Sequence, residues 1–307
     1  MKKFKWILVP LFDEESKRKF EKYIYDKVGK KIRVGKQYRD GLVLQLVSTD
    51  LKEFDLINIT CLNDYPAYRT DNVDKFIDWY ENVYSIFGNV EIIKHIPHAS
   101  LELPENQSMV FKGNFNLYNL KMSDVGIDLI FKDVPGIEYK APYSRLYCDV
   151  ERYKDNKKEE MSKYGQGYIY DKLYDGKTIF RFNIVNGHDV YKEIEDYYDN
   201  YHQGLTDLVN SKLKEGHDVL ILDLHSYSDE LAVHIDKKPP FPDICIGINE
   251  DFDNKKMLDY IINKIKEKGY SYQINYPYSG SIVPRNIIKG KGKVYSIMLE
   301  VNKRIYL

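Results

Sequence analysis

The chain has 307 residues, with 46 Lys and Arg against 47 Asp and Glu and a formal net charge of −1. This length corresponds to one large domain or two smaller ones, and 43% hydrophobic with 30% charged residues is a folded, globular composition. The balanced charge provides no long-range field to attract nucleic acid or an anionic membrane. Three cysteines without a CxxC pair argue against a disulfide framework. We attribute most of the 28 tyrosines to a compositional bias rather than to a tyrosine-lined binding surface.

The N-terminal apolar run, residues 6–12, superficially resembles a signal peptide. It is short, contains Pro10 and leads directly into acidic residues without a small-residue cleavage site, so it predicts a first β-strand. No stretch approaches the ~20 apolar residues of a membrane span. We therefore expect a cytoplasmic protein with no membrane partner and no nucleic-acid partner.

Residues 1–88 have the pattern of alternating strands and helices. After the first strand, apolar residues at helical spacing predict a helix through Phe20 and Val28, and residues 41–47 predict a strand. A second helix begins near Asp71 and ends at Gly88. This segment holds no catalytic constellation, so we interpret residues 1–88 as an accessory α+β segment.

From residue 89 onward, short apolar strands alternate with helices. The predicted strands are 90–96, 145–150, 218–224, 243–248, 271–276 and 294–301, and the predicted helices are 124–131, 190–214 and 254–268. This alternation predicts an α/β domain over residues 89–307, with a mixed, largely parallel sheet flanked by helices. Ligands bind such sheets beyond the carboxyl ends of the strands, so the residues that follow each strand are the candidates for function.

Histidines follow two of these strands, in His95-Ile96-Pro97-His98 and in Asp223-Leu224-His225. A single histidine at such a place is more often structural. For the pair, a metal site and a structural role are equally well supported, because neutral imidazole is a common zinc ligand. Catalytic zinc needs a third protein ligand. The candidates in the sequence are Asp124, Asp128 and Glu102.

An acid also lies inside the last apolar strand, where Glu300 would be costly to bury without a partner. The structural interpretation is an ion pair with Lys303 or Arg304. The functional interpretation is a general base whose surroundings raise its pKa toward neutrality.

Two arginines, Arg145 and Arg152, flank the stretch 145–152 and could grip a substrate carboxylate. Pairing with Asp149 or Glu151 at the surface is the interpretation that this stretch alone favours. On the long predicted helix, His202 faces either the site or the core.

Taken in order, these clusters resemble the N-formylglutamate amidohydrolase family, which is related in fold to the zinc carboxypeptidases and aspartoacylases. The resemblance covers residues 90–307 and rests on seven short segments: Pro97-His98-Ala99-Ser100, Ser123-Asp124-Val125-Gly126-Ile127-Asp128, Arg145 with Cys148-Asp149-Val150-Glu151-Arg152, Tyr201-His202, Asp223-Leu224-His225-Ser226, Pro242-Asp243-Ile244-Cys245-Ile246-Gly247 and Leu299-Glu300-Val301.

The resemblance implies one zinc ion bound by two histidines and an acid, a glutamate as general base, and substrate-binding residues on neighbouring loops. Mapped onto this sequence, the metal ligands are His98, Asp124 and His225, the base is Glu300, and the substrate-binding residues are Arg145, Arg152 and His202.

The sequence departs from the family pattern in two places: Ala99-Ser100 replaces the usual Ser-Gly or Ala-Gly, and Glu151 replaces an asparagine before Arg152. The resemblance implies a zinc-dependent hydrolase of small N-acyl amino acids, with N-formylglutamate as the lead substrate. The alternatives are a metallo-carboxypeptidase for short or cell-wall peptides and, in another class, a non-catalytic binding protein that keeps the fold.

Overall fold

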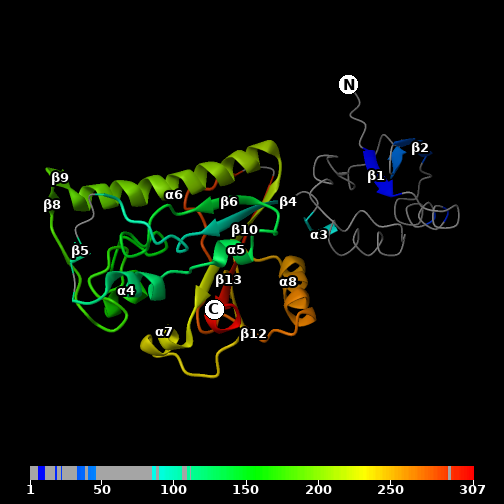
Figure 1. The fold of residues 1–307 in the computed structure, drawn as a ribbon. Coiled ribbons are helices and arrows are strands. Elements are labelled where there is room, and N and C mark those ends of the chain that lie inside the picture. Colours follow the sequence, from blue (N-terminus) through cyan, green and yellow to red (C-terminus); the bar gives the residue numbers. More distant parts are fainter. Residues whose placement is uncertain are drawn as a thin grey trace. The chain divides into compact units, whose positions relative to one another are not determined.

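The computed structural model describes residues 6–10, 18, 22, 33–38, 41–45, 85–87, 90–105, 109–110, 112–289 and 292–307. The chain divides into two compact units, Met1–Val90 and Glu91–Leu307 (Figure 1).

In the first unit, the described strands form a three-stranded antiparallel sheet. Its order is β1 (Trp6–Pro10), β3 (Gly41–Gln45) and β2 (Arg33–Tyr38), and the short helix α3 spans Ser85–Phe87. The strands predicted at the N-terminus and at 41–47 correspond to β1 and β3. The two predicted helices lie outside the described residues, apart from α3 and residues 18 and 22.

The second unit is built on a six-stranded sheet. Its order is β12 (Tyr272–Ile274), β11 (Ile244–Ile248), β13 (Val294–Asn302), β10 (Asp218–Tyr227), β4 (Val90–Ile96) and β6 (Ile137–Lys140). The pairs β10–β13, β11–β12 and β4–β6 are parallel, and only β11–β13 among the registered pairs of this sheet is antiparallel. The predicted fold class, a mixed and largely parallel sheet flanked by helices, is confirmed. Outside this sheet lie the short strands β5 (Met109–Val110), β7 (Phe180–Arg181), β8 (Ile184–Val185) and β9 (His188–Asp189).

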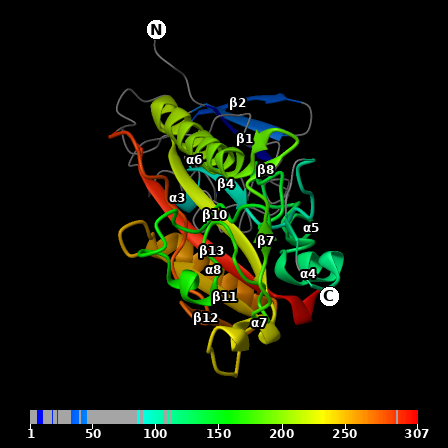
Figure 2. The same cartoon turned by 90° about the vertical axis from the view of Figure 1, so that its left-hand side faces the viewer.

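The longest helix of the described residues, α6 (Val190–Glu215), lies along one face of the sheet (Figure 2). Asp189 caps its N-terminus by accepting a hydrogen bond from the Lys192 N–H, and it ends at Gly216 in the left-handed conformation. Its apolar side packs on β4 and β10, in a core that contains Ile93, Leu205, Val209, Leu213, Val219 and Ile221. The remaining helices are α4 (Phe115–Met122), α5 (Ile127–Ile130), α7 (Asp229–His234) and α8 (Lys255–Glu267), with 3-10 turns η4 (Glu160–Tyr164) and η5 (Lys303–Ile305).

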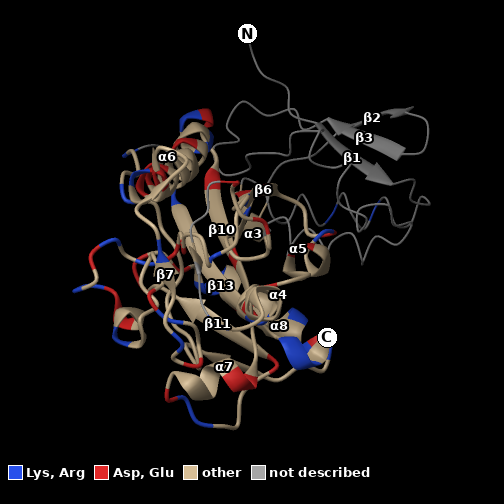
Figure 3. Ribbon diagram, turned by 60° about the vertical axis from the view of Figure 1, so that its left-hand side comes forward, with Lys and Arg blue, Asp and Glu red and all other residues tan. Residues whose placement is uncertain are grey.

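Charged residues are concentrated on the helices and loops, whereas the strands of the main sheet are mostly uncharged (Figure 3). These strands contain five acids, of which Glu91, Glu138 and Asp218 are at least partly exposed, whereas Asp223 and Glu300 are buried in the apolar layer. Among the described helices, none is both long enough and apolar enough to cross a bilayer.

The strand predicted at 145–150 is wrong. This stretch forms a turn in which the N–H groups of Tyr147 and Cys148 donate to the Ser144 carbonyl oxygen. Residues 146–150 are all buried, so the apolar character that predicted a strand reflects a turn enclosed in the protein interior. The helix predicted at 124–131 shortens to α5, because the segment before Ile127 is turned by backbone hydrogen bonds instead of continuing the helix.

Gly247 in β11 provides a test of how tightly the sheet packs against the loop around Gly280. A Cβ atom on Gly247 would lie 2.1 Å from the Gly280 carbonyl oxygen and 2.5 Å from Cε of Met298. We expect Gly247→Ala to lower the free energy of unfolding by about 1–3 kcal/mol, because the backbone at Gly280 must move. Urea unfolding measures this, and an unchanged midpoint and slope would contradict the packing described here.

Candidate metal centre and active site

Two buried imidazoles face one another where β4 and β10 end. His98 follows β4 and His225 lies near the end of β10. Their Nδ1 atoms are 3.3 Å apart, and the ring centroids are 5.1 Å apart. The structure thus brings together the two histidines that the sequence singled out.

A buried carboxylate orients each imidazole from its far side. His98 Nε2 donates to Asp149 Oδ1 at 2.8 Å, and His225 Nε2 donates to Asp223 Oδ1 at 3.0 Å. A neutral imidazole with its proton on Nε2 has a lone pair on Nδ1. Both lone pairs therefore point into the same small space, as in carboxylate–histidine–metal triads.

Asp124 completes this arrangement with an oxygen. Its Oδ2 lies 3.3 Å from His225 Nδ1 and 3.6 Å from His98 Nδ1. The Asp124 N–H donates to the His98 carbonyl oxygen, which fixes the backbone, and Ser226 Oγ donates to Asp124 Oδ1, which fixes the carboxylate. Lys303 fixes the same loop by donating to the carbonyl oxygens of Lys121 and Ser123.

The other two candidates for a third ligand do not reach this space. Asp128 is paired with Lys140, and its Oδ1 accepts from the Leu129 N–H. Glu102 is exposed and does not line the cavity described below. Only Asp124 of the three lies beside both histidines.

The two imidazoles and Asp124 could hold a divalent cation. Two facing lone pairs and a carboxylate repel one another unless positive charge lies between them. Burial alone would lower the pKa of His225, but the carboxylates of Glu151 and Asp223 and the hydrogen bond with Asp124 raise that pKa well above its ordinary value. The site therefore demands a proton or a metal ion, and the N₂O donor set with spacings near 3.3 Å suits a borderline metal ion such as zinc.

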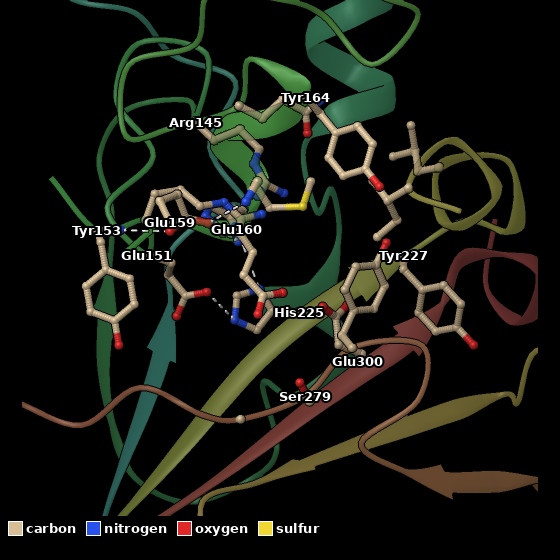
Figure 4. A pocket seen from close by; sticks show the side chains of 18 of the residues that line it. Arg145, Glu151, Tyr153, Glu159, Glu160, Tyr164, His225, Tyr227, Ser279 and Glu300 are labelled. Atoms are coloured by element: carbon tan, nitrogen blue, oxygen red, sulfur yellow. Dashed lines mark hydrogen bonds and ion pairs between the residues drawn. The ribbon is translucent and has the colours of Figure 1, made fainter. Parts of the chain in front are cut away.

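Glu151 offers a further oxygen, since one donor atom each of His98, Glu151 and His225 lie within 4.8 Å of one another. Its Oε2 is 3.0 Å from His225 Nε2, which is the side of the ring turned away from His98. Asp124, on the Nδ1 side of both rings, is therefore the better-placed third donor. Figure 4 shows Glu151 and His225 joined on this far side.

Glu300 lies next to His225 on the neighbouring strand, because the parallel register of β10 and β13 pairs these two residues. Its Oε2 is buried without a hydrogen-bond partner among the described residues, so the predicted ion pair with Lys303 or Arg304 is absent. Burial raises the pKa of Glu300 to about 7. A divalent cation beside it would lower this pKa and leave a carboxylate at neutral pH.

These residues lie in a cavity of about 780 Å³ that is lined by His98, Asp124, His225 and Glu300 and also by Arg145 and Arg152 (Figure 4). Arg145 donates to Asp149 at 2.8 and 3.1 Å, to the Tyr170 hydroxyl and to the Met122 carbonyl oxygen. The hydrogen bonds of Arg145 are thus made to other protein groups and not to the space of the cavity. Arg152 is ion-paired with Asp149 (Nε to Oδ2, 3.5 Å) and Glu159 (Nη1 to Oε1, 4.0 Å), but its buried Nε has no hydrogen-bond partner among the described residues.

His202 also lines the cavity, from the inner side of α6. Burial lowers its pKa to about 4, so its imidazole is neutral. Its Nε2 atom is buried and has no partner among the described residues. The neutral ring can therefore accept or donate one hydrogen bond in the cavity.

Sequence reasoning did not assign roles to Asp149, Asp223 and Arg285. Asp223 precedes His225 by two residues, and this spacing places both side chains on one face of a strand, which was a usable signal. Arg285 lines the cavity and lies 5.8 Å from the ring centre of Tyr153. No local pattern marks it, because the loop that carries it is placed by tertiary contacts.

The fold and the site together define an α/β protein with a buried histidine–carboxylate centre at the carboxyl ends of its strands, an arrangement suited to metal-assisted hydrolysis. The family model for N-formylglutamate amidohydrolase matches residues 90–307, and the chain belongs to this amidohydrolase family.

A solved structure shares the fold. An N-formylglutamate amidohydrolase from Ralstonia eutropha JMP134 is 20% identical with a TM-score of 0.56, over 70% of this chain and 83% of that one. A gene product from Agrobacterium tumefaciens is 15% identical with a TM-score of 0.48, over 70% of this chain and 80% of that one. No curated protein matches the sequence.

Separate substitutions of Asp124 and Asp128 test which of the two is the third metal ligand. We expect Asp124→Asn to weaken the binding of a divalent metal ion by at least about 100-fold, more than the loss of a supporting hydrogen bond would. Asp128→Asn is the matched control, four residues away and paired with Lys140, and should leave metal affinity unchanged. Metal titration against a chromophoric chelator measures both. Equal losses in the two variants would contradict the geometry.

Proposed function

We propose that this protein is a zinc-dependent amidohydrolase of small N-acyl amino acids, with N-formylglutamate, cleaved to formate and glutamate, as the lead substrate. The observation that carries the proposal is the pair of facing Nδ1 atoms beside Asp124, with the unpartnered Glu300 carboxylate in the same cavity. Membership of the amidohydrolase family supports it.

We assign the metal to His98, Asp124 and His225. Zinc, when bound, supplies a Lewis acid that polarises an amide carbonyl and makes water more acidic. The protein's own contribution begins with Asp149 and Asp223, which hold the two imidazoles with Nδ1 turned inward. Because these carboxylates are buried and fully hydrogen-bonded, the site is organised before a ligand arrives.

Glu300 is the general base in this proposal. Its free oxygen accepts a proton from the attacking water and then delivers that proton to the nitrogen of the departing amino acid. Burial raises the pKa of Glu300 and a bound cation would lower it, so at neutral pH the group is a carboxylate that can take up a proton and pass it on. The water oxygen bonds to the carbonyl carbon first, and the amide C–N bond breaks after the nitrogen receives the proton, which yields a carboxylic acid and an amine.

The substrate carboxylates need cations that can still form hydrogen bonds. We propose Arg152, whose Nε has no hydrogen-bond partner although the guanidinium is ion-paired, and Arg285 at the cavity wall for this role, and His202 as a neutral hydrogen-bonding partner. Arg145, which sequence comparison placed among the substrate-binding residues, mainly stabilises Asp149 in this proposal, although it also lines the cavity.

The alternative of a metallo-carboxypeptidase for short or cell-wall peptides has one observation in its favour. A cavity of about 780 Å³ belongs to the range that holds drug-sized ligands, which are larger than N-formylglutamate. A panel of N-acyl amino acids and short peptides ranks the two by kcat/KM. Higher kcat/KM for peptides would replace the lead substrate and leave the chemistry in place.

Glu300→Gln tests the proposed base, since the amide keeps the shape and removes proton acceptance. We expect kcat to fall by about 10²–10⁴-fold while zinc content stays at the wild-type level. Chelation should abolish wild-type activity, and added zinc should restore it. Activity that survives Glu300→Gln would remove the base, and a protein inactive on every substrate would favour the non-catalytic alternative.

Arg152→Gln tests carboxylate binding. We expect KM for N-formylglutamate to rise by about 10–100-fold with a smaller change in kcat, since a charged hydrogen bond contributes about 1.5–3 kcal/mol. The wild type should prefer N-formylglutamate over its carboxamide analogue, N-formylglutamine, and the variant should lose much of that preference. An undiminished preference would mean that Arg152 binds neither substrate carboxylate.

A further inference from the structure

A chain of hydrogen bonds connects helix α6 to the proposed metal ligand His225. The Tyr201 hydroxyl lies 2.8 Å from His95 Nε2, His95 Nδ1 lies 2.7 Å from Asp223 Oδ1, and that oxygen lies 3.0 Å from His225 Nε2. All four side chains are buried, and His95 is fully so. The chain therefore crosses three elements, α6, β4 and β10, through the protein interior and reaches the cavity at Asp223 and His225.

One arrangement of protons satisfies every atom in this chain. The Asp223 carboxylate only accepts, so both histidines donate to its Oδ1. His95 then has its proton on Nδ1 and accepts at Nε2 from the Tyr201 hydroxyl. The second oxygen of Asp223 accepts from the Ile282 N–H at 3.0 Å, which leaves the carboxylate no freedom to turn.

We propose that His95 and Tyr201 are positioning residues, which lock Asp223 in place and thereby hold the proton of His225 on Nε2 and its Nδ1 lone pair toward His98 and Asp124. This inference rests on the metal site of the proposed function and deepens it. A His225 with its proton on Nδ1 would present an N–H to the cation and could not bind it.

The same atoms admit a competing interpretation, since His95, Glu151 and Asp223 each offer a donor atom within 4.8 Å of the others, as a second cation site would require. The contacts favour hydrogen bonds. The 2.7 Å between His95 Nδ1 and Asp223 Oδ1 is shorter than the roughly 3.3 Å that separates two ligands of a tetrahedral zinc ion with bonds near 2.0 Å. In addition, no donor atom in this group is left without a partner.

The α6 helix offers a matched pair of substitutions. Tyr201→Phe removes only the hydroxyl that donates to His95. Tyr197→Phe removes the hydroxyl of a tyrosine one turn earlier, whose ring centre is 6.4 Å from that of Tyr201 and whose hydroxyl lies outside the chain. A second pair at His95 compares Leu, which removes both ring nitrogens, with Asn, whose amide can still donate to Asp223.

Two measurements are needed, zinc affinity by chelator competition and the ¹⁵N shifts of the His225 ring nitrogens in the metal-free protein. We expect Tyr201→Phe to weaken zinc binding by about 3–10-fold and His95→Leu by about 10–100-fold, with His95→Asn close to wild type and Tyr197→Phe unchanged. At a pH high enough to leave the metal-free His225 ring neutral, the ¹⁵N shifts should report a proton on Nε2 in the wild type and a mixture of tautomers in Tyr201→Phe. At saturating zinc, kcat should recover in Tyr201→Phe.

Wild-type zinc affinity and an unchanged tautomer in Tyr201→Phe would overturn the inference, even if His95→Leu fails to fold. Two zinc ions per wild-type chain, one of them lost in His95→Asn, would overturn it in favour of the second cation site. A protein that binds no zinc would defeat the proposed function alone, because the tautomer of His225 in the metal-free protein still tests the positioning role.

Discussion

The site depends on one electrostatic constraint: two buried imidazoles face each other through Nδ1 at 3.3 Å, with the Asp124 carboxylate beside them. Each ring is held in this orientation by a buried carboxylate on its far side, so neither can turn away to relieve the repulsion. Such a cluster is stable only with positive charge at its centre. The arginines beside Asp149 offset part of the negative charge that surrounds the histidines, and a divalent cation between the rings would offset more of it.

The fold brings these groups together by ordinary sheet geometry. Parallel pairing of β10 with β13 places Glu300 next to His225, and the end of β4 delivers His98 to the same edge. The loop between α4 and α5 is tied to His98 through its backbone, which carries Asp124 into the gap. Residues far apart in the sequence thus converge because strands of one sheet end at one edge.

The fold and the site residues could be predicted from the sequence where the signal was a local pattern of residues. The apolar run of β10 and the helical spacing of α6 predicted both elements nearly to their ends. The turn at 145–150 was mistaken for a strand because its apolar residues are buried by packing against other segments and not on one face of a strand. The partner of His98 is 51 residues away, and that of His95 is 128 residues away, so no local pattern could reveal these two pairings, unlike that of Asp223 with His225. The tyrosines were also underestimated, since several of them line the cavity: Tyr153, Tyr164, Tyr170, Tyr174, Tyr198, Tyr227 and Tyr278.

The central claim is that the Nδ1 atoms of His98 and His225 bind one metal ion together with Asp124. Anomalous diffraction at the zinc edge, from crystals of the zinc-loaded protein, tests it most directly. The account predicts one strong peak, about 2.0–2.1 Å from both Nδ1 atoms and about 2.0–2.2 Å from an oxygen of Asp124. A peak among His95, Glu151 and Asp223, or bonds through the Nε2 atoms, would contradict it.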